Sequence, residues 1–156
     1  MIKGQTVSTS ESAGLRRYTD ALAPYTLTIL RLLMGITFLL TGLPKLGNLA
    51  GFTGFVASLG LPVPGFVAVV VAALEVIGGL LLIAGLGTRW VSLLFAIEML
   101  ITTLLVKLPN QGFLAPQGQP GTGAVYDLLL LVGALVLLTH GSGQLSVERN
   151  VIGREL

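Results

Sequence analysis

The chain has 156 residues, of which 53% are hydrophobic and only 10% are charged. Soluble domains carry about 25% charged residues, so this chain has too few to cover a water-exposed surface. We therefore expect a small all-α integral membrane protein. The absence of cysteine and the single histidine, His140, exclude disulfides, thiolate-bound zinc, iron–sulfur clusters and histidine-rich sites, so we predict no metal site. The net charge of +2 comes from scattered cations and does not predict nucleic-acid binding.

The first apolar stretch follows a polar segment, residues 1–23, which we expect to be cytoplasmic. Residues 24–43 contain one charge in about twenty residues, which is long enough to cross the hydrocarbon at about 1.5 Å per residue. The stretch is too long for the apolar region of a signal peptide, and no small-residue cleavage site follows it. We expect a retained first span.

A second pattern, over residues 46–62, is too short to cross a membrane but has apolar residues at helical spacing. These residues are Phe52, Phe55, Val56 and Leu59. The sequence predicts a short interfacial helix between the first and second spans, ended by Gly60-Leu61-Pro62 and covering the bundle from outside.

Three further apolar stretches complete a four-helix bundle, at about residues 64–86, 90–106 and 122–139. Together they form one domain over residues 24–140, followed by a cytoplasmic tail, residues 141–156. The uncharged loop at residues 108–123 is rich in Pro, Gly and Gln, and it fits either a partner-binding segment or a plain connector.

Orientation follows from the distribution of cations in the short connections. One side carries Lys3, Arg16, Arg17, Arg89, Arg149 and Arg154, and the other carries Lys45 and Lys107. We expect both termini in the cytoplasm.

Four charged residues fall inside the spans, where an unpaired charge costs about 2.5–3.5 kcal/mol or more. Counting along the helices places Arg31, Glu75 and Glu98 near one depth, and they are the catalytic candidates. Asp127 enters nearer the outer surface, close to the level of Lys45 and Lys107, where a second cluster could form. A structural alternative is an ion pair between Arg31 and Glu75 that only fixes helix packing.

Two helix faces support convergence at the centre of the bundle. Along the first span, steps of four and three residues place on one face Arg31, Gly35, Phe38, Gly42 and Lys45. The second span places on one face Ala68, Ala72, Glu75 and Gly79, and its small residues allow close packing of helices. The candidate cofactor-binding residues are Arg31, Gly35, Phe38, Gly42, Lys45, Glu75, Gly79 and Asp127.

The same residues give the chain a resemblance to a known family. The segment RLLMGITFLLTGLPKL carries Arg31, Gly35, Phe38, Gly42 and Lys45, and the Gly60-Leu61-Pro62 element follows it. The segment ALEVIGGLLLIAGLGTRW carries Glu75, Gly78, Gly79, Gly85 and Arg89. After the fourth span comes GSGQLSVERNVIG, which begins with a Gly-x-Gly-x-x-Ser pattern. This order resembles the DoxX family of small four-helix bacterial membrane proteins, and the resemblance implies that the spans lie in a bacterial inner membrane. The chain departs from the family at GTGAVYD, where a glutamate often follows a Gly-Gly pair, and at Glu98, which the pattern lacks.

The resemblance implies a redox-linked role, since some relatives look like membrane subunits of thiosulfate:quinone oxidoreductases and others belong to assemblies that handle oxidative stress. It favours a subunit that binds a quinone and acts with a redox partner protein, rather than a complete enzyme. Two alternatives stay open: a non-catalytic membrane anchor or assembly partner, and a small proton- or cation-coupled carrier. Membrane lipid is an expected partner in each case, and an oligomer is compatible with all three.

Overall fold

The computed structural model describes residues 8–115 and 121–152. Within these residues the chain forms helices and no strands. The helices are α1 (Ser8–Gly47), α2 (Leu49–Ser58), α3 (Pro64–Ala73), η1 (Leu74–Gly78), α4 (Gly79–Ala84), α5 (Thr88–Thr102), η2 (Thr103–Lys107), α6 (Leu108–Gln111), α7 (Gly123–His140) and η3 (Glu148–Ile152). The η elements are π-helical turns, which hold one more residue per turn than an α-helix.

Four helical segments of the described chain are long and apolar enough to span a membrane: Thr19–Gly47, Pro64–Ala84, Thr88–Gln111 and Gly123–His140. This confirms the all-α four-helix class and the shorter helix, α2, between the first and second spans. The bounds differ from the expected ones because α1 and the third span are longer than their apolar stretches. In particular, α1 already begins at Ser8 and continues past Lys45.

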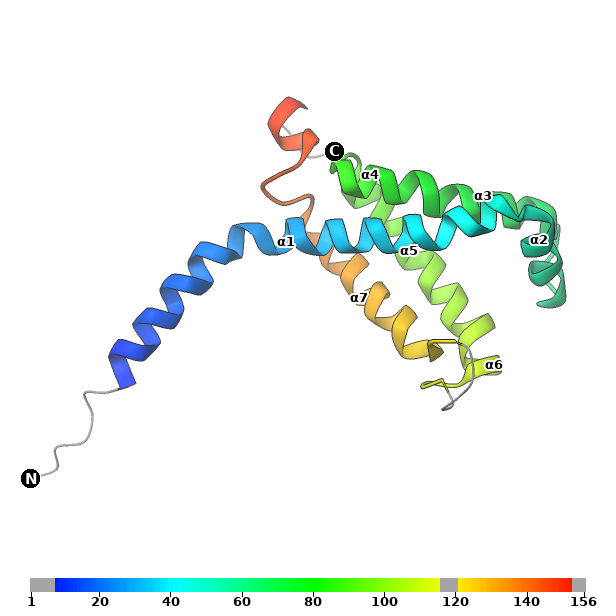
Figure 1. Ribbon diagram of the computed structural model, residues 1–156, viewed down its shortest axis with the longest axis horizontal. Coiled ribbons are helices and arrows are strands. Elements are labelled where there is room, and N and C mark those ends of the chain that lie inside the picture. Colours follow the sequence, from blue (N-terminus) through cyan, green and yellow to red (C-terminus); the bar gives the residue numbers. More distant parts are fainter. Residues whose placement is uncertain (1–7, 116–120, 153–156) are drawn as a thin grey trace, which may run out of the picture.

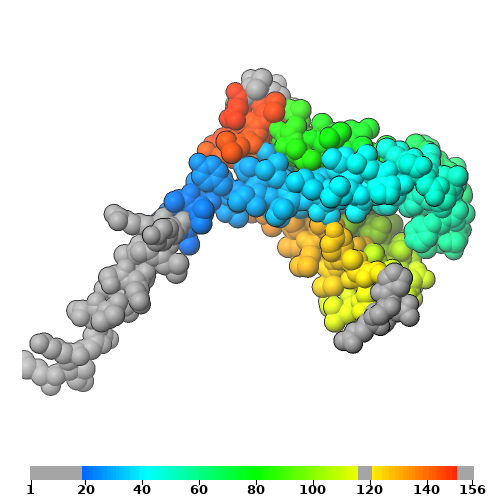
Figure 2. All heavy atoms as spheres, in the orientation of Figure 1, coloured from blue at the N-terminus to red at the C-terminus, as the bar shows by residue number. Residues whose placement is uncertain are grey.

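The spans are arranged as two antiparallel pairs. Helix α1 packs against η1 and α4, and α5 packs along α7. Figure 1 shows that the two pairs diverge towards the ends that carry α2 and α6, while the N-terminal part of α1 turns away from the bundle. The space-filling view in Figure 2 shows the same divergence. The structure is therefore tightly packed at one end and splayed at the other.

Glycines set the register of the first pair. A Cβ built on Gly79 would lie 2.8 Å from the carbonyl oxygen of Gly35 and 2.9 Å from the backbone nitrogen of Leu39. A Cβ on Gly42 would lie 2.7 Å from the Cβ of Glu75. Because only glycine permits so close an approach of two helix backbones, these contacts fix which residues of α1 face which residues of the second span.

A small apolar core joins the two pairs. Phe38 of α1 stacks on Phe95 of α5, with ring centroids 3.5 Å apart and planes 2° from parallel, and both rings are buried. The core also contains Met34, Leu82, Val91, Ala96, Met99, Ala134 and Leu137. Most other large apolar side chains, such as Leu33 and Leu129, are exposed on the outside of the bundle, as expected where lipid replaces water as the solvent.

The short helix α2 covers the splayed end. Its N-terminus is capped by Asn48, whose side-chain oxygen accepts a hydrogen bond from the backbone N–H of Gly51 at 3.1 Å. Helix α2 packs against α3, and the connection to α3 passes through Gly60 and Val63, both at positive φ. Its apolar face therefore points into the protein rather than only into the membrane interface.

The close glycine contact predicts that Gly79→Ala destabilises the protein by about 1–3 kcal/mol, because the added methyl meets backbone atoms that cannot move independently. The matched control is Gly54→Ala in α2, where an added Cβ meets nothing within 4 Å. Thermal unfolding in detergent, followed by Trp90 fluorescence, should show a lower midpoint for Gly79→Ala alone. Equal midpoints for the two variants would contradict the assigned register.

Candidate functional site

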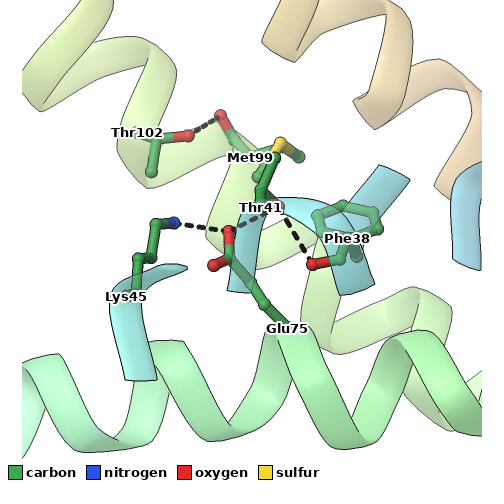
Figure 3. A network of polar contacts seen from close by, with 6 residues as sticks. All are labelled: Phe38, Thr41, Lys45, Glu75, Met99 and Thr102. Carbon is green, nitrogen blue, oxygen red and sulfur yellow. Dashed lines mark hydrogen bonds and ion pairs between the residues drawn. The ribbon is translucent and has the colours of Figure 1, made fainter. Parts of the chain in front are cut away.

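An ion pair between the first two spans lies where the helix pairs begin to diverge. The ammonium of Lys45 lies 2.6 Å from Oε1 of Glu75, and the Thr41 hydroxyl lies 3.4 Å from the same oxygen (Figure 3). Thr41 also donates to the carbonyl oxygen of Phe38 at 3.0 Å. The Glu75 side chain is 4% exposed and that of Lys45 28%, so the pair is largely shielded from solvent and lipid.

Two further carboxyl groups lie close to this pair. Glu98 of α5 interacts electrostatically with Glu75, Lys45 and Asp127 of α7. Glu98 is 6% exposed and Asp127 is 5% exposed. Both oxygens of Glu98, Oε2 of Glu75 and Oδ2 of Asp127 are buried without a hydrogen-bond partner. Each of three spans thus contributes one buried acid to a single polar centre.

This polar centre forms one wall of a cavity of about 740 Å³. The other walls are mostly apolar, and they include the inward face of α2, with Phe52, Phe55, Val56 and Leu59. Lys45 lies 5.1 Å from the centre of the Phe52 ring, so the lysine also contacts the covering helix through a cation–π interaction. The residues that were predicted as an interfacial face therefore line a cavity.

Irregular helix turns border this cavity on two sides. Glu75 lies in the π-helical turn η1, and Lys107 ends the turn η2. An extra residue in a helical turn changes the direction of the side chains on either side of it, and such turns occur frequently at functional sites. Leu105, Val106 and Lys107 of η2 line the cavity together with Glu75 of η1.

The predicted convergence of Arg31 with Glu75 and Glu98 is wrong. Gly42 of α1 faces Glu75, whereas Arg31 lies beside Gly85. Arg31 is therefore about 16 Å from the level of Glu75 along α1, because eleven residues at about 1.5 Å each separate it from Gly42. The guanidinium of Arg31 instead donates to the carbonyl oxygens of Ser142 and Leu145. The structural alternative of an Arg31–Glu75 ion pair is therefore wrong as well.

Arg31 anchors the segment that follows α7. Within this segment the Ser142 hydroxyl donates a hydrogen bond to the Ser146 hydroxyl at 2.9 Å. Glu148 attracts the guanidinium of Arg31 electrostatically. Glu148 is 1% exposed, and its Oε1 accepts a hydrogen bond from the backbone N–H of Gly87 at 2.6 Å. This arrangement ties the end of the chain to α1 and to the turn between α4 and α5.

The second predicted cluster, of Asp127 with Lys45 and Lys107, also needs correction. Lys45 pairs with Glu75 rather than with Asp127. Lys107 instead bonds to Gln111 at 3.4 Å and to Thr122 at 3.1 Å. Of the six charged residues that were predicted at two depths, the five other than Arg31 nevertheless line the one cavity: Lys45, Glu75, Glu98, Lys107 and Asp127.

The remaining candidates separate into two groups. Phe38 lines the cavity, whereas Gly35, Gly42 and Gly79 form the close contact between helices.

The loop at residues 108–123 is held by backbone hydrogen bonds. The N–H groups of Ala124 and Val125 donate to the carbonyl oxygens of Gly112 and Phe113 at 3.0 Å, which brings the two ends of the loop together. Residues 116–120 lie outside the described part, so a partner-binding role for the loop stays a prediction.

Sequence reasoning missed several residues that matter to these sites. Thr41 lies on the same face of α1 as Phe38 and Lys45, so its helical spacing was a usable signal. Glu148 and Ser142 offered no such signal, because a charge and a hydroxyl in a polar tail are usually solvated. Only the Gly-x-Gly-x-x-Ser resemblance pointed to order in that segment.

The contacts of Arg31 predict that Arg31→Gln releases the segment around residues 142–149. Two charge-assisted hydrogen bonds are lost, so trypsin should cleave after Arg149, an exposed residue, at least about tenfold faster. Limited proteolysis followed by mass spectrometry measures this rate, with Leu33→Ala as a control on the exposed side of α1. An unchanged rate would contradict the anchoring role.

The ion pair predicts energetic coupling between Lys45 and Glu75. Lys45→Met leaves the buried Glu75 without its partner, and Glu75→Gln leaves the partly buried Lys45 without its partner, whereas the double variant removes both charges. A double-mutant cycle, measured by SDS-induced unfolding in mixed micelles, should give a coupling of about 1–3 kcal/mol. The same cycle on Arg31 and Glu75 should give none, and coupling there would contradict the structure.

Comparison with known proteins agrees with the fold. The sequence model of the DoxX family matches residues 26–108. A Bacillus subtilis protein named "Putative oxidoreductase CatD" is 38% identical over 122 residues, which cover 77% of this chain and 82% of that protein. An uncharacterized membrane protein of Mycobacterium tuberculosis is 32% identical over 149 residues, covering 88% of each chain.

Inner membrane protein YphA of Escherichia coli is 33% identical over 136 residues, covering 85% of this chain and 96% of that protein. No solved structure gives a significant match. The family match covers more than half of the chain; it begins within the first span and ends within the third. The chain is a multi-pass membrane protein that belongs to the DoxX family.

Proposed function

We propose that the cavity beside Lys45, Glu75 and Glu98 binds a lipid-soluble quinone, and that the protein is a membrane subunit acting with a redox partner protein. The observation that carries the proposal is an apolar cavity within the membrane-spanning region that ends in a buried polar centre. Most buried polar groups in membrane spans are paired within the protein, whereas four carboxyl oxygens here are not.

The residues present suit such a ligand in size and polarity. A volume of about 740 Å³ lies within the range typical of small-molecule sites, roughly 300–1,000 Å³. Aromatic and aliphatic side chains from α2 and α5, including Phe52 and Ile101, would hold the ring and tail. The ammonium of Lys45 has three N–H donors and uses one on Glu75, which leaves donors for a ligand oxygen.

Access through the lipid is consistent with an apolar ligand. Leu94, Ile97, Ile101 and Leu105 line the cavity, and each is about half exposed, between 46% and 49%. Because these side chains belong to the third span, we expect part of their exposed surface to face the membrane interior. A ligand dissolved in the bilayer could therefore enter between the helix pairs without crossing water.

The chemistry divides between ligand, protein and partner. A bound quinone supplies two-electron, two-proton redox chemistry. In this chain, Lys45 would orient a ligand oxygen, and Glu98, a buried carboxyl beside Glu75, would hold or transfer a proton. The chain has no cysteine and one histidine, so electrons would come from a partner protein or a soluble reductant. The name of the Bacillus relative, an oxidoreductase, is in line with this role.

We place the protein in a bacterial inner membrane with both termini cytoplasmic. The distribution of cations supports this orientation, and the Escherichia coli relative is named as an inner membrane protein. In that orientation, Arg31 and the segment after α7 lie at the cytoplasmic side. The cavity and α2 then lie in the outer half of the membrane.

Binding of decylubiquinone to the purified protein in nanodiscs tests the proposal. Lys45→Gln removes a charged donor from the cavity wall and should weaken binding by about tenfold or more. Leu100→Ala, on α5 but outside the cavity, should bind like the wild type. Titration followed by ligand-induced quenching of tyrosine and tryptophan fluorescence gives both dissociation constants.

The same titration separates the proposal from a purely structural anchor. An anchor would fold through the Lys45–Glu75 pair but would not bind the quinone saturably. Absence of saturable binding by the wild type, or equal binding by Lys45→Gln and the wild type, would contradict the proposed site.

A further inference from the structure

The buried carboxyl groups of the cavity offer hydrogen-bond acceptors that nothing in the described chain satisfies. The unpartnered atoms are Oε2 of Glu75, Oε1 and Oε2 of Glu98, and Oδ2 of Asp127. All three residues line the cavity and are more than nine-tenths buried. A buried acceptor without a partner is costly, so a ligand that donates hydrogen bonds to these atoms gains more than one that cannot.

Several donors around the same cavity are already used by acceptors within the protein. The Thr41 hydroxyl donates to Phe38, and the Thr102 hydroxyl donates to the carbonyl oxygen of Met99 at 3.2 Å. Lys45 uses one of its three N–H donors on Glu75, and Lys107 uses two on Gln111 and Thr122. If Glu75 and Glu98 share one proton, one oxygen of Glu98 and Oδ2 of Asp127 still have no donor within hydrogen-bond distance in the described chain, so this wall offers acceptors to a ligand.

We propose that the cavity binds the reduced form of the lipid-soluble carrier, a quinol, more tightly than the oxidised form, a quinone. This inference rests on the proposed function. A quinone presents two carbonyl oxygens, which only accept hydrogen bonds. The quinol presents two hydroxyl groups, which can donate to Glu98 and to the free oxygen of Glu75 or Asp127. The apolar walls accept the same ring and tail in both forms, so the discrimination resides in the acid cluster.

This preference has a thermodynamic consequence. A site that binds the reduced form more tightly raises the reduction potential of the bound couple by about 30 mV for each factor of ten in affinity. The bound carrier would therefore accept electrons more readily than the same carrier free in the lipid. That property suits a site that receives electrons from a partner protein.

Three probes that share one ring and tail test the inference on the wild-type protein in nanodiscs under anaerobic conditions. They are decylubiquinol, decylubiquinone and the dimethyl ether of decylubiquinol, which keeps the ring and tail but has no hydroxyl donor. Decylubiquinol should bind at least about tenfold more tightly than the other two, because satisfying a buried acceptor that otherwise has no partner contributes about that factor. Competition against a tritiated quinone analogue gives all three dissociation constants.

A variant of Glu98 tests whether this residue causes the preference for decylubiquinol over decylubiquinone. Glu98→Gln replaces one acceptor oxygen by an amide donor of the same shape, so the preference for decylubiquinol should fall several-fold while decylubiquinone binding is retained or improved. Leu100→Ala should keep the full preference. The comparison of three probes on the wild type stands even if Glu98→Gln does not fold.

The outcomes separate the two proposals. Saturable binding of all three probes with equal affinity, or tighter binding of decylubiquinone, would overturn the preference for the quinol and leave the quinone site intact. Tight binding of the dimethyl ether would overturn the role of hydroxyl donors. Absence of saturable binding of every probe would overturn the quinone site itself.

Discussion

The close contact between α1 and the second span is the constraint on which the rest of the structure depends. Gly35 and Gly79 bring two helix backbones to a distance at which no side chain fits, and this contact permits only one register. From that register it follows that Arg31 lies beside Gly85 at one end and that Gly42 lies beside Glu75 towards the other. The positions of all buried charges on these two helices are thereby determined.

The register divides the polar interior into two centres with different properties. At one end, both terminal nitrogens of Arg31 donate to the backbone of the segment after α7, and Glu148 attracts the guanidinium, which is typical of structural anchoring. At the other end, one lysine faces three carboxyl groups beside a cavity, and several of their oxygens have no partner. An incompletely satisfied polar centre next to open space is the more informative of the two for function.

The fold could be predicted from the sequence because its main signals are local. Long apolar stretches and the Phe52, Phe55, Val56 and Leu59 spacing were enough to predict four spans and a short helix between the first two. The grouping of charges was less predictable, because it depends on helix register. Counting from the ends of the apolar stretch placed Arg31 near the level of Glu75, whereas helix contacts shift it by about three turns. The packing of Ser142, Leu145 and Glu148 around Arg31 had no local signal at all.

Native mass spectrometry of the protein, extracted from its own membranes in mild detergent, tests the central claim most directly. The account predicts a retained molecule with the mass of a quinone or quinol, displaced when decylubiquinol is added and lost in Lys45→Gln. A protein that carries only phospholipid, or no small molecule, would contradict the assignment of the cavity as a redox carrier site. It would leave the Lys45–Glu75 pair as a structural element of a four-helix membrane anchor.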